Sequence, residues 1–235
     1  MEQQEVKEPS RWRRLFGKDR FDFLLVLILI QLVVLSGFNH PAVLHLALWL
    51  PIFILFVAFR SSGINIRVRS FLLLWFGIFV ILAGSSLALW YAMPSNPNAL
   101  IYARIPAFAA AIIIDLLIIG MIVRRLIKHD RINLTTVFGA LCIYLQIGLF
   151  FAALYGLIGS ATLGQFFAGS TVDSQVIYVY YSYSCLTTVG FGDFVAAANL
   201  GRMLSVSEAI IGQLYLVGGV ALIVGSLGKT RVDRK

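Results

Sequence analysis

Long apolar runs alternate with short polar segments along the chain. Six runs hold 18 residues or more: residues 21–38, 42–59, 71–92, 105–123, 134–158 and 204–226. A bilayer core about 30 Å thick needs about 20 helical residues to cross it, and every backbone polar group inside that core must be hydrogen-bonded. The pattern predicts six transmembrane helices and an all-α membrane protein.

The composition supports the same prediction. Hydrophobic residues make up 60% of the chain and charged residues 13%, whereas soluble domains average about 45–50% and about 25%. A chain with so few charged residues is not a water-soluble enzyme. The six runs leave only tails and short loops, so no separate soluble domain is expected.

The basic residues predict the orientation in the membrane. If the N-terminus is cytoplasmic, 17 of the 19 Lys and Arg residues fall on the inner side and only Arg104 and Arg202 fall outside. This bias follows the positive-inside rule for an even number of spans. Both ends are therefore expected in the cytoplasm. The net charge of +8 then reflects topology and attraction to anionic lipid rather than nucleic-acid binding.

One further apolar stretch does not fit the pattern of spans. Residues 176–187 are apolar and aromatic, but a helix of this length reaches only about 18 Å, which is too short to cross the bilayer core. We expect it to enter the membrane and turn back. The non-helical residues that follow must then be buried in protein or line a water-filled path.

The residues after this short helix, 188–193, read TVGFGD. This run resembles the selectivity-filter signature of potassium channels, which contains the sequence TVGYG. Gly201 and Arg202 follow as in simple bacterial potassium channels. The resemblance covers residues 134–228, whereas the first four spans resemble the family's six-helix plan only in number and topology. It implies passive, potassium-selective conduction across the plasma membrane, without chemical catalysis and without a cofactor other than the permeant K⁺ ions.

Two glycines in this run, Gly190 and Gly192, can adopt a positive φ without a Cβ penalty. The backbone can then turn successive carbonyl groups to one side, whereas an extended strand would alternate them. Inward carbonyls of Thr188, Val189, Gly190 and Phe191 would replace the water shell of a cation, with the Thr188 hydroxyl at the inner end. One chain supplies a quarter of such a ring, so we expect a homotetramer.

The chain departs from the family around this run. Phe191 replaces the usual tyrosine and lacks its hydroxyl, and Tyr180 and Tyr181 stand in place of the tryptophans that would receive that hydroxyl. Ser184 occupies the position where some bacterial members have a glutamate, so Asp193 lacks that partner. We expect these changes to weaken the contacts between the filter and the side chains around it, which affects the stability of the filter more than its choice of ion.

Four further residues receive candidate roles. Asp193 is expected at the outer mouth, where a carboxylate raises the local cation concentration. Glu208 is expected to face the short helix and support the filter from behind, as is Thr187, with a plain interhelical hydrogen bond as the alternative for Glu208. Gly212 aligns with the hinge glycine of the family, but a glycine in a membrane helix is as often a close-packing site.

The fourth span contains one acid, Asp115, and no basic residue; arginines appear only at its cytoplasmic end. A voltage sensor carries arginines at every third position, so voltage sensing is not expected. Asp115 is expected to face protein or water, either as a structural acid paired with His45 or Ser85 or as a functional sensor.

These observations divide the chain into four regions. Residues 1–20 form a basic cytoplasmic tail, 21–133 a four-helix transmembrane domain without sensor charges, 134–228 a pore domain, and 229–235 a second cytoplasmic tail. A weakly selective Na⁺/K⁺ channel is the nearest alternative function. A secondary transporter would need inverted repeats or two broken helices, and only one re-entrant segment is evident. An accessory subunit without conduction is the third alternative.

Overall fold

The computed structural model describes residues 21–37, 50–58, 104–127, 134–169 and 174–232, together with the single residues 77, 84 and 101. Within the last range, the side chains of residue 220 and of residues 222–232 are not included. The predicted third span apart from residues 77 and 84, half of the second span, the N-terminal tail and residues 233–235 lie outside these residues. His40, His45, Ser85 and His129 also lie outside them.

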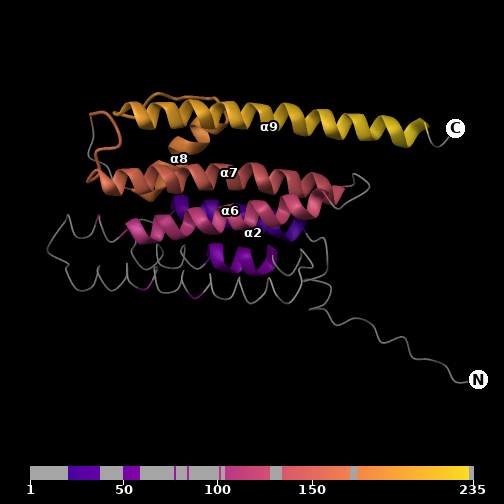
Figure 1. The fold of residues 1–235 in the computed structure, drawn as a ribbon, viewed down its shortest axis with the longest axis horizontal. Helices are drawn as coiled ribbons and strands as arrows, with labels where there is room; N and C mark the ends of the chain where they lie inside the picture. The colour runs from indigo at the N-terminus through magenta and orange to yellow at the C-terminus, as the bar shows by residue number, and fades with distance from the viewer. Residues whose placement is uncertain are drawn as a thin grey trace, which may run out of the picture.

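The described residues are helical apart from turns and one isolated bridge between Phe167 and Ala196, so the all-α prediction is confirmed for them. In chain order the labelled helices are α2 (Phe21–Gly37), α6 (Ile105–Ile127), α7 (Leu134–Ala161), α8 (Gln175–Leu186) and α9 (Asn199–Val232). Residues 50–58 are helical as well. In Figure 1, α6, α7 and α9 run along the long axis, and the short α8 lies between α7 and α9.

The helix bounds lie within three residues of the predicted ones at α2, α7 and α8 and differ more at two others. α6 continues past the predicted end at residue 123 to include Arg124 and Arg125 in its last turn. α9 begins five residues before the predicted start and has 34 residues. At about 1.5 Å per residue it is about 51 Å long and exceeds a bilayer core of about 30 Å.

Two of the described helices, α6 and α7, are long and apolar enough to cross a membrane, and α2 is a shorter apolar helix. α2 packs against α7, and α7 packs against α6. Their shared core contains Leu24, Ile28, Ile118 and Cys142, each with no exposed surface. Helices α2 and α6 thus pack on one side of α7, and α8 and α9 lie on its other side (Figure 1).

A second core consists of aromatic side chains and fixes the position of α8. Tyr178 and Tyr181 of α8 pack against Phe166 and Phe167 of the turn after α7, with ring centroids 5.2–5.9 Å apart. Tyr155 of α7 joins them at 5.2 Å from Tyr181. Each such ring pair contributes about 0.5–1.5 kcal/mol beyond its buried area. The cluster holds the short helix against α7 and so positions the residues that follow it.

Candidate functional site

The segment of residues 187–193 folds back onto the end of α8. Thr187 caps the helix in an αR conformation, with φ −83° and ψ −2°. The amide of Thr188 then donates to the carbonyl of Cys185 at 2.9 Å, and the amide of Gly190 donates to the carbonyl of Ser184 at 3.1 Å. These bonds tie the start of the segment to the last turn of the helix.

Every second residue of this segment has a left-handed backbone. The φ angles are 59° at Thr188, 57° at Gly190 and 81° at Gly192. A positive φ at the two glycines is what their lack of a Cβ allows. The sequence does not predict a positive φ at Thr188, because a β-branched residue rarely adopts this conformation. A non-glycine residue in this conformation stores about 1–3 kcal/mol of strain. Such strain is found at binding sites, where many surrounding contacts hold the backbone in place.

Tyr180 supports the segment from the side. Its ring stacks on Phe191, with centroids 5.6 Å apart and an interplanar angle of 12°. Its hydroxyl donates to Oδ2 of Asp193 at 2.9 Å. Asp193 therefore has a partner, although the family's glutamate position is occupied by Ser184. The Ser184 hydroxyl instead accepts a hydrogen bond from the amide of Phe191 at 3.3 Å.

Tyr181 takes a different place from its neighbour. Its ring belongs to the aromatic core, and its hydroxyl lies 2.7 Å from Oγ of Ser205 on α9. The two tyrosines therefore do not support the segment together. Tyr180 contacts the segment directly, whereas Tyr181 links α8 to α9.

Glu208 of α9 lies behind α8, with no exposed surface. The Ser182 hydroxyl is 2.5 Å from Oε1, and the Tyr155 hydroxyl donates to Oε2 at 2.7 Å. Ser182 also contacts the carbonyl of Gly148 at 2.7 Å. The Glu208 side chain thus connects α9 to both α7 and α8. Its contact with the short helix is the one that the sequence predicted.

Two further residues of α9 contact the end of α8 or the segment after it. Gln213 donates through Nε2 to Oγ1 of Thr188 at 3.1 Å. A Cβ added at Gly212 would lie 2.5 Å from the carbonyl oxygen of Leu186. The geometry at Gly212 therefore supports close packing of α9 against the end of α8, one of the two roles considered for it.

Asp115 is buried in α6 and accepts a hydrogen bond from Nε2 of Gln146 on α7. This partner differs from the two that the sequence indicated, His45 and Ser85, which lie outside the described residues. No group of three or more His, Cys, Asp and Glu side chains comes together in the part of the chain that the structure describes. The oxygen ligands available along residues 188–191 are backbone carbonyls and the Thr188 hydroxyl.

Comparison with known proteins agrees with this geometry. Residues 134–228 match a family model described as an ion channel. This range contains α7, α8, the 187–193 segment and most of α9. Searches of curated proteins and of solved structures found no match. The match and the apolar helices α6 and α7 indicate a membrane protein with an ion-channel domain.

Proposed function

We propose that the protein is a passive potassium-selective channel and that residues 188–192 are its selectivity filter. The observation that carries the proposal is the left-handed backbone at Thr188, Gly190 and Gly192, directly after a helix too short to span the membrane. Alternating backbone handedness turns successive carbonyls to one side. Four such segments around an axis would give rings of oxygens that replace the hydration shell of K⁺.

The exposed apolar surface of the single chain supports a homotetramer. Val189 is 56% exposed and Phe191 66% exposed. α9 carries a further set of exposed apolar side chains along its length: Leu200, Met203, Val206, Ile210, Ile211, Leu214 and Val217. Apolar surface of this extent belongs against lipid or protein. Fourfold assembly would bury the part of it that faces the axis and complete each ring of carbonyls.

Asp193 then lies at the outer mouth of the proposed pore. Its carboxylate is exposed and is oriented by the Tyr180 hydroxyl. Four such carboxylates around the axis would raise the local concentration of cations. With both ends in the cytoplasm of the cell, as the distribution of Lys and Arg predicts, this mouth faces outward from the plasma membrane.

Selectivity for K⁺ over Na⁺ is favoured over weak selectivity by the support behind the proposed filter. Tyr180, Ser184 and Gln213 each contact it, and Glu208 connects the helices that hold it. A filter held by several independent contacts resists collapse onto the smaller ion. A secondary transporter would need a second broken helix, and among the five labelled helices of the described residues only α8 is re-entrant in length.

Ion flux from reconstituted vesicles tests this proposal. Vesicles loaded with K⁺ or Rb⁺ should show protein-dependent flux, and vesicles loaded with Na⁺ should show far less. Ba²⁺ should block the K⁺ flux, since it is close to K⁺ in size and binds the same oxygens more strongly. Equal Na⁺ and K⁺ flux would refute selectivity, and no flux of either ion would refute a channel.

The charge distribution of α6 predicts weak voltage dependence. Its only basic residues, Arg124 and Arg125, occupy its last turn. One charge crossing the membrane yields about 2.3 kcal/mol per 100 mV, so steep gating needs several charges within the field. Planar-bilayer currents should therefore be nearly ohmic. A gating charge of several elementary units per channel, reduced when Arg124 and Arg125 are replaced by Gln, would contradict this expectation.

A further inference from the structure

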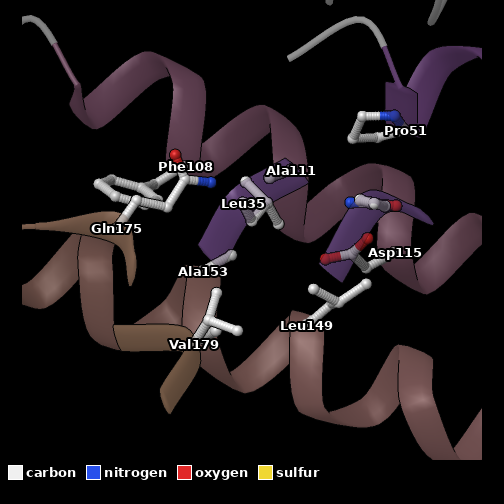
Figure 2. A pocket seen from close by; sticks show the side chains of 11 residues that line it. Leu35, Pro51, Phe108, Ala111, Asp115, Leu149, Ala153, Gln175 and Val179 are labelled. Atoms are coloured by element: carbon white, nitrogen blue, oxygen red, sulfur yellow. The ribbon is translucent and has the colours of Figure 1, made fainter. Parts of the chain in front are cut away.

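Different parts of the molecule hold the two ends of α8. Near its start, Val179 lines a cavity of about 30 Å³ together with Leu149 of α7 and Asp115 of α6 (Figure 2). The aromatic core holds the middle of the helix against α7. The last residue of α8, after which the proposed filter begins, also contacts α9.

The contact with α9 involves Gly212 and the residue after it. A Cβ added at Gly212 would lie 2.5 Å from the carbonyl oxygen of Leu186, so the backbone of α9 lies directly against the end of α8. The Tyr144 hydroxyl of α7 donates to the same carbonyl at 3.4 Å. Two helices therefore hold Leu186, and from this point Gln213 reaches Thr188.

The hydrogen bonds of the Thr188 hydroxyl define what Gln213 does there. A threonine hydroxyl has one proton to donate and two lone pairs that can accept. The Thr188 hydroxyl donates its proton to the carbonyl of Thr187 at 2.7 Å. Toward Gln213 it can only accept, so Nε2 of the Gln213 amide is the donor, at 3.1 Å. One lone pair of the hydroxyl remains, and the exposed position of Thr188 leaves it accessible to a cation.

The same bond bears on a strained residue. The φ angle of Thr188 is 59°, in a region that a β-branched residue rarely adopts. Its amide donates to the carbonyl of Cys185 within the last turn of α8, whereas the bond from Gln213 comes from another helix. Gln213 thus restrains the Thr188 side chain independently of α8 and fixes the direction of the hydroxyl oxygen.

We propose that Gln213 is a positioning residue for the innermost cation site of the proposed filter. Its amide holds the Thr188 hydroxyl with the remaining lone pair directed to the pore axis, where four such oxygens would bind a cation entering from the cytoplasm. A ligand held in its binding orientation loses less conformational freedom when the cation binds. The inference rests on the proposed function, and Gln213 acts through Thr188 without touching the ion.

Planar-bilayer recordings of Gln213→Met test this role. Methionine is also long and unbranched but has no donor. Losing one neutral hydrogen bond should raise the cytoplasmic K⁺ concentration that gives half-maximal conductance by about two- to tenfold. Ser207→Ala is the control, since Ser207 is also exposed on α9 but donates to the Met203 carbonyl of its own helix. The control should keep the wild-type concentration.

A double substitution separates positioning from a general effect on packing. Thr188→Val removes the hydroxyl that accepts from Gln213, so adding Gln213→Met to it should cause no further change. For any variant that does not conduct, the melting temperature of the purified full-length protein replaces conductance. A cation that binds the folded state raises this temperature in proportion to log concentration above its dissociation constant, so Gln213→Met should need more K⁺ for the same rise.

Failure of this inference is distinguishable from failure of the channel. A wild type that does not conduct, or that passes Na⁺ and K⁺ equally, would refute the proposed function and the inference with it. A K⁺-selective wild type whose half-maximal concentration is unchanged in Gln213→Met would overturn the role of Gln213 alone. So would a melting temperature that is lower at every K⁺ concentration with an unchanged dependence on K⁺, since the bond would then only join two helices.

Discussion

Replacing Gly190 with Ala is expected to abolish K⁺ flux. The φ angle of Gly190 is 57°, in the left-handed region. An L-residue with a Cβ is disfavoured there by about 1–2 kcal/mol per subunit, and four subunits would bear this penalty at one level of the pore. An added Cβ meets nothing within 4 Å in the single chain. The expected effect is therefore on backbone conformation, turning carbonyls away from the axis, and not on packing.

A matched glycine provides the control for this experiment. Gly120 in the middle of α6 also has open space around an added Cβ, but its backbone is helical. Gly120→Ala should keep the wild-type K⁺ flux and, because alanine favours helices, should be at least as stable. The assignment of residues 188–192 as the filter is wrong if Gly190→Ala conducts as well as Gly120→Ala does.

The second large effect is expected at Glu208. Its carboxyl group lies beside Ser182 of α8 and Tyr155 of α7. Truncation to Ala would leave buried hydroxyl groups without this partner, at about 1–3 kcal/mol per subunit. We expect Glu208→Ala to lower the thermal stability of the tetramer and to reduce K⁺ over Na⁺ selectivity, because α8 would be held less firmly behind the proposed filter.

Glu208→Gln distinguishes this role from a general effect of removing an acid. A hydroxyl donates only one proton, yet Ser182 contacts both the carbonyl of Gly148 and Oε1 of Glu208. Both contacts are favourable if Ser182 donates to Gly148 and the Glu208 side chain donates to Ser182. A glutamine amide can do the same, so Gln should restore most of the stability and selectivity lost in Ala. If Ala matches wild type in both measurements, Glu208 does not support the filter.

Much of the pore region could be predicted from the sequence because its constraints are local. A stretch too short to span the membrane, followed by closely spaced glycines, predicts a re-entrant helix and a turn with positive φ. The structure has α8 and left-handed Gly190 and Gly192 at these places. The left-handed Thr188 could not be predicted, since intrinsic preference opposes it and only the surrounding contacts hold it there.

The partners of the polar side chains depend on how helices rotate about their axes, which a single sequence does not determine. For this reason the sequence does not indicate that Gln146 faces Asp115. The same holds for the separation of Tyr180 from Tyr181: they are neighbours in sequence but point about 100° apart on a helix of 3.6 residues per turn. One therefore contacts Phe191 and the other contacts α9.

The reversal potential under bi-ionic conditions tests the central claim most directly. Purified protein is reconstituted into a planar bilayer with K⁺ on one side and an equal concentration of Na⁺ on the other. Each tenfold ratio of permeabilities shifts the reversal potential by about 59 mV. A ratio of about 100 or more is expected, so the potential should lie about 118 mV or more from zero in the direction that opposes K⁺ flow. A reversal potential near zero would contradict a potassium-selective filter at residues 188–192.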